Sequence, residues 1–524
     1  MYLRDLVHCL KQKNKKMKLQ SFVVKLQSFV LALFLIAING ALISTSFIFK
    51  KRGYWWVYTI ILMIPVAMKF YYVIIHGLFA LFRRGYYKEK HPFVYDKTKK
   101  FFTLVPAYRE DKSELLNTLN SVKEQDGIDG INTVVVICDG DFEAAAAARE
   151  IFDDGISLDI NEAYYDWKNE SNDVELRKGV WNGINYILIV KKRNIGKRDS
   201  LVVVRTLAYN QLKKTSDYAM KMNPQLVNFW NNNMEPVDYI VGTDADTHYK
   251  KDAFIKMLDD LDGSGADGAV GYIHVDNIKS GFWIWYQRIE YAIAQHIRRM
   301  SQSRVYERVS CLSGAFQILR VETTCTTEIL KNFNTPPNEY ILYSLLVSLF
   351  SEDRRHCLEA LRINNKLRFR QVLDAVCFTT PPISLSVFLS QRRRWSLGAS
   401  FNEAFMALSI NTNIFERFWG LVDGFVLACV PFYVFSIFML LYIVITDFKI
   451  TMLYFGITMI INWIIDLSIA VWSPAIPKEE KKFFPLQFVV FVIGAPWVCL
   501  TMFMYTFATS YKIKWGKTTV KEIK

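Results

Sequence analysis

The sequence has few cysteines, and they follow no regular pattern. Eight occur among 524 residues, and no two stand in a C-x-x-C spacing. Zinc ribbons and the disulfide frameworks of small secreted proteins both depend on such spacing. The absence argues against both, and we expect reduced, structural cysteines. They are Cys9, Cys138, Cys311, Cys325, Cys357, Cys377, Cys429 and Cys499.

The chain also lacks a stripe of basic residues interleaved with aromatic ones, which is typical of nucleic-acid-binding surfaces. The net charge is +14, but the basic residues gather beside apolar segments, as at Lys16, Lys18, Arg83 and Arg84. Positive charge in such places is typical of the cytosolic flank of a membrane span. We therefore expect a lipid bilayer, and no nucleic acid, among the partners.

Long apolar segments are abundant, and hydrophobic residues make up 52% of the chain. Residues 29–49 carry no charge and can cross a hydrocarbon core of about 30 Å. No small-residue cleavage site follows them, so we predict a retained span rather than a signal peptide. A second span is predicted over residues 55–82, in which Lys69 either lines a polar path or extends toward the membrane surface. Further apolar candidates are residues 420–445, 450–472 and 483–508.

Residues 91–383 have the character of a soluble α/β domain. Short β-rich runs alternate there with helical stretches such as residues 111–125, where Asp111 can cap the helix. This alternation predicts a mostly parallel sheet, with ligands at the carboxyl ends of its strands. The polar residues 166–180 are predicted to form an insertion or a surface loop. The predicted strands cover residues 101–105, 133–137, 186–190 and 239–241.

Acidic residues follow two of the predicted strands. The run YIVG leads into Thr243-Asp-Ala-Asp246, and alternate residues of an extended segment point the same way. Asp244 and Asp246 can therefore share a hard cation, which in turn can neutralise a diphosphate. Asp139 and Asp141 lie at the equivalent place upstream, in ICDGD. A lone D-x-D is common in loops, so the second acidic strand end strengthens the prediction.

Two charged runs lie downstream. In SEDRR, a carboxylate could act as general base on a sugar hydroxyl, although the adjacent arginines weaken a base and also suit a plain surface ion-pair run. In QRRRW, three consecutive arginines precede Trp395 shortly before an apolar region. Arginine runs in such places commonly anchor a membrane protein on its inner side. Each run alone leaves both interpretations open.

The order of the motifs carries a resemblance. VPAYRED, ICDGD, GKR, TDAD, SEDRR and QRRRW, between about Phe101 and Trp395, resemble the ordered signature of the processive family-2 glycosyltransferases. These include the chitin, hyaluronan and cellulose synthases. Within the group, YQRIEYAIAQH, CLSGAF, the EDR triplet and SQRRRW are similar to chitin synthase segments. Hyaluronan synthases tend to carry D-D-R and cellulose synthases T-E-D. The chain is compact and stops soon after Lys514-Trp-Gly-Lys517, unlike many larger chitin synthases.

This resemblance implies a GT-A type α/β glycosyltransferase domain combined with an α-helical transmembrane region. It implies that Tyr108, Glu110 and Asp139 hold uridine. The residues Asp244 and Asp246 are implied to hold the diphosphate through magnesium or manganese, and Lys197 to add a cation near the phosphates.

The resemblance also assigns the transfer step. The catalytic base falls on Asp353, which would deprotonate the 4-hydroxyl of the growing chain's last sugar. Gln391 and Trp395 would contact the acceptor and Arg394 the diphosphate. The implied activity is inverting, processive synthesis of β-1,4-linked chitin from UDP-N-acetylglucosamine, with transfer of the chain across the membrane. The implied partners are that donor, the growing chitin chain and the bilayer, and a homo-oligomer stays open.

Alternatives remain at this point. A hyaluronan synthase or a chito-oligosaccharide synthase is the nearest one. A lipid-acceptor transferase usually lacks Q-x-x-R-W, and the intact acidic motifs argue against an inactive membrane scaffold. We expect residues 1–90 to form a cytosolic N-terminus and two spans, and residues 91–383 the cytosolic domain. Interface helices (384–415) are expected next, followed by membrane or interface helices and a cytosolic tail (416–524).

The expected location is the cell membrane, in a multi-pass arrangement. Because Pro485, Gly494 and Pro496 weaken residues 483–508 as a straight span, we predict that this segment lies along the inner interface. A fifth span would also leave the basic tail outside, against the charge rule. The prediction is therefore four true spans.

Overall fold

The computed structural model describes residues 2–512, apart from residues 55, 56, 59, 63–95, 128–131, 141, 142, 277–280, 410 and 447–450. Most of the predicted span over residues 55–82, with Lys69, lies outside the described residues. So do Asp141 and the part of the basic tail that contains Trp515.

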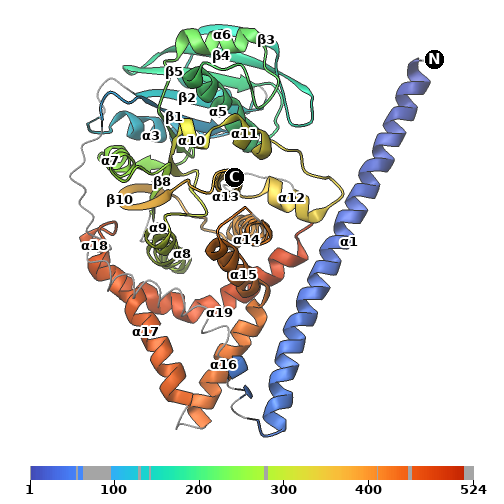
Figure 1. Ribbon diagram of the computed structural model, residues 1–524, viewed down its shortest axis with the longest axis vertical. Helices are drawn as coiled ribbons and strands as arrows, with labels where there is room; N and C mark the ends of the chain where they lie inside the picture. The colour runs from blue at the N-terminus through green and yellow to red at the C-terminus, as the bar shows by residue number, and fades with distance from the viewer. Residues whose placement is uncertain are drawn as a thin grey trace.

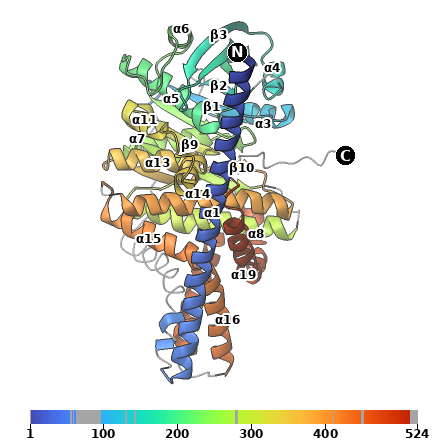
Figure 2. The same cartoon turned by 90° about the vertical axis from the view of Figure 1, so that its right-hand side faces the viewer.

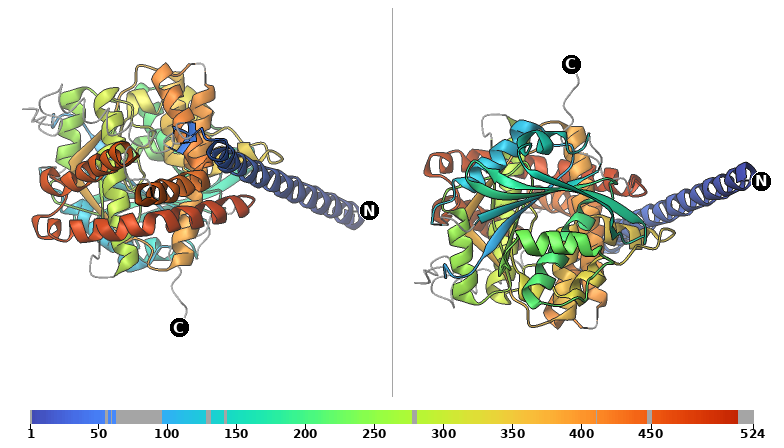
Figure 3. Two further views of the ribbon diagram at one scale, coloured as in Figure 1. Left: turned by 90° about the horizontal axis from the view of Figure 1, so that it is seen from below. Right: turned by 90° about the horizontal axis from the view of Figure 1, so that it is seen from above.

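A ten-stranded sheet forms the centre of the α/β domain, in the order β3-β4-β5-β2-β1-β6-β9-β8-β10-β7 (Figures 1 and 3). The strands β5, β2, β1 and β6 are parallel neighbours, as are β8 and β10, whereas the other pairs are antiparallel. The α/β class is confirmed, and the sheet is parallel at its centre and mixed at its flanks. The strands are β1 (Phe101–Ala107), β2 (Asn132–Asp139), β3 (Ile156–Tyr165), β4 (Ser171–Trp181), β5 (Ile184–Lys191), β6 (Tyr239–Thr243), β7 (His248–Tyr249), β8 (Gly268–Val275), β9 (Phe316–Arg320) and β10 (Phe369–Thr379).

The four predicted strands are confirmed as β1, β2, β5 and β6. They are buried along almost their whole length, as expected for apolar strands covered on both faces. The predicted loop over residues 166–180 is wrong, because most of it is strand β4, which pairs antiparallel with β3 and β5. Val174 and Leu176 of this strand are buried, and so are the polar Asn172 and Glu175, because the strand pairs on both sides.

Helices cover both faces of the sheet. Neighbouring residues of β1 point to opposite faces, so that Phe101 packs with α3 and α7 and Phe102 packs with α5, α6 and α11. Asp111 stands at the N-cap of α3, where the sequence predicts a helix start. The helices of this domain are α3 (Lys112–Lys123), α4 (Ala146–Ile151), α5 (Lys197–Lys213), α6 (Pro224–Asn233), α7 (Ala253–Ser264), α10 (Val321–Thr324), α11 (Thr327–Phe333), α12 (Leu342–Leu349) and α13 (Glu352–Ile363).

Below the sheet, α8 (Phe282–Ile293), α14 (Leu385–Leu408) and α15 (Ile414–Ala428) form a layer of helices (Figure 2). A π-helix (Ala294–Arg299) and α9 (Met300–Val305) continue α8. The helix α14 contains the QRRRW motif and contacts α12, α13, α15 and α19. This layer therefore lies between the sheet and the apolar helices.

The remaining helices are apolar. Two of the described helices are long and apolar enough to cross a membrane, within Met17–Lys51 and Phe484–Ala508, or three if the bent pair α15 and α16 counts as one span. The predicted single span over residues 420–445 is divided between that pair, which bends by 72°. Figure 1 shows α19 running across the underside of the α8 and α14 layer, whereas α16 runs down from it and α1 passes along the side of the molecule from the level of the sheet to the lower end. These helices are α1 (Tyr2–Lys51), α16 (Val430–Thr446), α17 (Thr451–Trp472), α18 (Lys478–Lys481) and α19 (Phe484–Ala508).

Candidate active site

One cavity of about 1100 Å³ opens at the carboxyl ends of the central parallel strands. The parallel order explains this, because side chains that follow β1, β2 and β6 meet at the same edge of the sheet. The helices α13 and α14 supply the opposite wall. Every site residue singled out from the sequence lines this cavity: Tyr108, Glu110, Asp139, Lys197, Asp244, Asp246, Asp353, Gln391, Arg394 and Trp395.

Lys197 lies at the centre of the charged groups. It is the first residue of α5, and its Nζ lies 2.6 Å from Asp244 Oδ1 and 3.3 Å from Glu352 Oε1. Burial lowers the pKa of Lys197, but Asp244, Asp353 and Glu352 together raise this pKa well above its ordinary value. The ammonium group is therefore charged and joins the carboxylates of β6 to those of α13.

Asp353 lies in the first turn of α13, after Ser351, whose φ of 57° is unusual for a residue with a side chain. The backbone N–H of Gly314 donates a hydrogen bond of 2.7 Å to Asp353 Oδ2. Burial raises the pKa of Asp353 to about 6. Lys197 and the Gly314 amide lower this pKa, whereas the negative charges of Glu352 and Asp244 raise it further. A carboxyl group in this range can accept a proton near neutral pH.

Gly314 allows this close approach. A Cβ at this position would lie 2.6 Å from Lys197 Nζ and 2.8 Å from Asp353 Oδ2. Any larger residue would therefore displace one of the two charged groups. The sequence pattern gives Gly314 no role, although its segment CLSGAF carries part of the resemblance.

Asp244 and Asp246 follow β6, and the Asp246 side chain is accessible to solvent inside the cavity although protein surrounds it on most sides. Burial, followed by repulsion from Asp244 and Glu110, raises the pKa of Asp246 to about 7. No three His, Cys, Asp or Glu side chains come together as a metal site in the part of the chain that the structure describes. Magnesium is commonly held by one or two carboxylates plus substrate phosphates, so this pair fits a cation shared with a diphosphate.

The helix α14 brings Gln391, Arg394 and Trp395 to the cavity wall. Trp395 is 41% exposed, and its ring meets Tyr291 of α8 edge to face with centroids 5.9 Å apart. An exposed indole in this cavity offers an apolar face for stacking. This wall therefore suits a ligand with both hydroxyls and an apolar face.

The other two arginines of QRRRW face the protein. The membrane-anchor interpretation of Arg392 and Arg393 is wrong, because both are buried. The guanidinium of Arg392 pairs with Glu290 at 2.6 Å and lies 4.2 Å from the centre of the Trp395 ring. Arg393 donates hydrogen bonds to the carbonyls of Thr509 and Lys512, just beyond the end of α19. Both arginines thus fix neighbouring helices.

A second buried network connects the acidic motif of α13 to α14. Arg354 donates hydrogen bonds to Ser310 and to Glu403, which lies on α14. Glu403 also pairs with Arg298, whose guanidinium reaches Asp423 of α15. The first turn of α13 is therefore tied to α14 and α15. Sequence reasoning missed Glu403 and Glu290, because nothing in the local sequence marks a charge as buried or pairs it with a distant partner.

Comparison with known families identifies the chain. A family model described as chitin synthase matches residues 185–523, which include the acidic pair, the EDR triplet and QRRRW. The chain belongs to the chitin synthase family. It is therefore a glycosyltransferase that makes chitin, and its α/β domain is the glycosyltransferase domain predicted from the resemblance.

Relatives support this assignment along most of the chain. Chitin synthase 8 of Gibberella zeae is 27% identical over 530 residues, covering 96% of this chain and 79% of the relative. Chitin synthase 8 of Verticillium dahliae is 28% identical over 436 residues, covering 74% of this chain and 70% of the relative. With its long apolar helices, this chitin synthase is a membrane protein.

Solved structures show a fainter likeness. The mannosyltransferase PcManGT from Pyrobaculum calidifontis, in complex with GDP-Man and Mn²⁺, is 12% identical with a TM-score of 0.42, over 83% of this chain and 99% of that one. Residues 1–349 of S. aureus TarS in complex with UDP-GlcNAc are 13% identical with a TM-score of 0.33, over 79% of this chain and 90% of that one. At these values the likeness carries no argument about ligands or mechanism.

Proposed function

We propose that this chitin synthase uses UDP-N-acetylglucosamine to extend a β-1,4-linked chain processively, and that it moves the chain across the membrane. The observation that carries the proposal is the meeting of all the residues singled out from the sequence in one cavity. Tyr108 and Glu110 follow β1, Asp139 is the last residue of β2, and we assign the uridine to these three residues.

In this proposal each residue of the cavity has its own role in the transfer step. Asp353 accepts the proton of the 4-hydroxyl on the last sugar of the chain, while that oxygen bonds to the anomeric carbon of the donor. The bond from this carbon to UDP breaks on the opposite side, so the configuration inverts. Lys197 and Arg394 place positive charge near the diphosphate, and Trp395 stacks against the acceptor sugar.

The acidic pair completes the donor site. We assign magnesium or manganese to Asp244 and Asp246 together with the diphosphate oxygens. When bound, such a cation offsets the negative charge that develops on the departing UDP. Its protein ligands in this proposal are the two carboxylates, which line one cavity.

The donor and product can be tested directly. We expect purified protein supplied with UDP-N-acetylglucosamine alone to make an insoluble product that chitinase degrades. Measuring radiolabel in the insoluble fraction before and after chitinase checks this expectation. A strict requirement for UDP-glucuronate would instead indicate a hyaluronan synthase. A product limited to short soluble oligomers would indicate a chito-oligosaccharide synthase.

The contacts of α19 support a topology in which this helix lies along the inner interface. Glu480, just before it, pairs with Arg288 of α8, and Arg393 of α14 binds the carbonyls of Thr509 and Lys512 just after it. Both ends of α19 are therefore held to the layer beneath the catalytic domain. Ser510 also contacts Ser28 of α1 at 2.6 Å.

We predict that a C-terminal tag is protected from protease added to intact cells, because the tail lies on the cytosolic side with the catalytic domain. The same tag placed between α16 and α17, at residues 446–449, should be cut, since we predict that connection to be external. Cleavage is read by immunoblot before and after permeabilisation. A C-terminal tag removed from intact cells would contradict this topology and make α19 a span.

A further inference from the structure

A fully buried lysine lies directly behind the nucleotide end of the cavity. Lys191 is the last residue of β5, and Asp139 is its register partner at the end of the parallel strand β2. The Nζ of Lys191 lies 2.6 Å from Asp139 Oδ1 and 2.9 Å from Asp199 Oδ2. None of the Lys191 side chain is exposed, so it cannot touch a ligand in the cavity.

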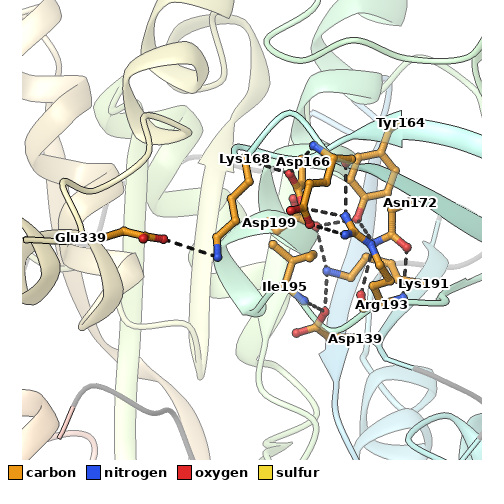
Figure 4. A network of polar contacts seen from close by, with 11 residues as sticks. Asp139, Tyr164, Asp166, Lys168, Asn172, Lys191, Arg193, Ile195, Asp199 and Glu339 are labelled. Carbon is orange, nitrogen blue, oxygen red and sulfur yellow. Dashed lines mark hydrogen bonds and ion pairs between the residues drawn. The ribbon is translucent and has the colours of Figure 1, made fainter. Parts of the chain in front are cut away.

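Buried lysines need a reason, because removing an ammonium group from water is costly unless anions compensate. Here two carboxylates do so, and Tyr164 donates a hydrogen bond of 2.6 Å to the same oxygen of Asp199 (Figure 4). Asn172 in turn donates to the Tyr164 hydroxyl at 2.9 Å. The β3–β4 hairpin thus closes the network from behind and holds Asp199 in place.

The network ends on the loop that places Lys197. Asp139 accepts hydrogen bonds from the backbone N–H groups of Ile195 at 3.0 Å and Gly196 at 2.7 Å. A carboxylate offers about four acceptor positions, and Lys191 with these two amides occupies three of them. The one that remains suits a single donor, such as the N3–H group of a uracil ring.

We propose that Lys191 is a positioning residue for the donor nucleotide. It holds the Asp139 carboxylate in the orientation that leaves one acceptor for the nucleobase. Asp199, Tyr164 and Asn172 hold Lys191 itself. The proposal rests on the proposed donor, UDP-N-acetylglucosamine, and adds to it a residue that never contacts this donor.

Steady-state kinetics separates positioning from catalysis. Lys191→Met should raise KM for UDP-N-acetylglucosamine about tenfold or more while kcat changes less than about threefold, because binding distant from the reacting carbon acts equally on ground and transition states. The matched control is Lys192→Met. Lys192 is the adjacent residue, its side chain is 43% exposed, and it pairs with the exposed Asp159. This control should leave both constants unchanged.

A charge-balanced variant keeps the proposal testable if the single variant does not fold. Lys191→Met combined with Asp199→Asn removes one cation and one anion, and Asp199→Asn alone is its reference. The double variant should bind UDP, measured by calorimetry, about tenfold more weakly than this reference, with melting temperatures compared in parallel. UDP binding equal to the reference would overturn the proposal. Decreases of equal size in kcat and in 1/KM for Lys191→Met would also overturn it. A double variant that cannot fold would do the same.

The proposed function and this inference fail in different ways. If wild-type protein neither binds UDP nor uses UDP-N-acetylglucosamine, the proposed donor is wrong. If wild-type protein does both but the Lys191 variants bind and turn over like their references, only the positioning role is wrong.

Discussion

Asp353→Asn is expected to lower chitin synthesis by at least about 100-fold, within the range that general base catalysis contributes. The amide keeps the shape of the carboxyl group but cannot take a proton. Gly314 N–H can still donate to the remaining side-chain oxygen, so the first turn of α13 should keep its position. Binding of UDP-N-acetylglucosamine should therefore stay close to the wild-type value.

The measurement pairs product formation with nucleotide binding on the same preparation. Asp252→Asn is the control, because Asp252 is a half-exposed carboxylate that pairs with Lys256 and does not line the cavity. It should leave both readouts unchanged. Turnover near the wild-type level in Asp353→Asn would remove Asp353 as the base.

The pH dependence gives an independent check. Burial raises the pKa of Asp353 to about 6, and a base works only when it is deprotonated. Wild-type activity should therefore be present above pH 6 and fall as the pH drops through that value. The residual activity of Asp353→Asn should lack this acid limb, because the titrating group is gone.

The local sequence predicted the site residues that lie at the ends of strands. Asp139 and Asp244 follow short β-rich runs, and parallel pairing of β2, β1 and β6 brings such ends to one edge. The alternation of residues on an extended segment likewise placed Asp244 and Asp246 in the same cavity. The resemblance added the residues from α5, α13 and α14, which strand and helix patterns alone could not have joined to these.

The sequence pattern did not predict which charged side chains are buried. QRRRW gives no sign that Arg392 pairs with Glu290, about a hundred residues earlier in the chain, or that Arg393 binds carbonyls after α19. The pair of Arg354 and Glu403 is also long-range. A charged run and a buried ion pair have the same composition, and only the fold decides which partner each charge meets.

The division of the apolar C-terminal region was also hidden. Hydropathy predicts a span over residues 420–445, but the pair α15 and α16 bends by 72° between Ala428 and Val430. By its length and apolarity, α19 is also a candidate span. The residues that flank it nevertheless contact other helices, because Glu480 pairs with Arg288 of α8 and Thr509 accepts a hydrogen bond from Arg393 of α14. Composition measures whether a helix can enter a bilayer, and tertiary contacts determine how it lies.

Removal of divalent cations is expected to abolish chitin synthesis, and Asp246→Asn is expected to make nucleotide binding insensitive to them. In the wild-type protein, burial and repulsion from Asp244 and Glu110 raise the pKa of Asp246 to about 7. A bound cation would relieve this repulsion and join the carboxylates to the diphosphate. The two residues proposed as its protein ligands line the same cavity.

The decisive measurement is UDP binding by calorimetry with EDTA, magnesium or manganese. For wild-type protein, restoring either ion should strengthen binding about tenfold or more, equivalent to about 1.4 kcal/mol, and restore synthesis. For Asp246→Asn the gain should vanish, while Asp159→Asn should behave as wild type, because Asp159 is 73% exposed and outside the cavity. Full synthesis in EDTA would show that transfer needs no divalent cation, and an unchanged metal response in Asp246→Asn would show that Asp246 is not a ligand of the cation. In the absence of a cation, Lys197, whose Nζ lies 2.6 Å from Asp244 Oδ1, would be the counterion for the diphosphate.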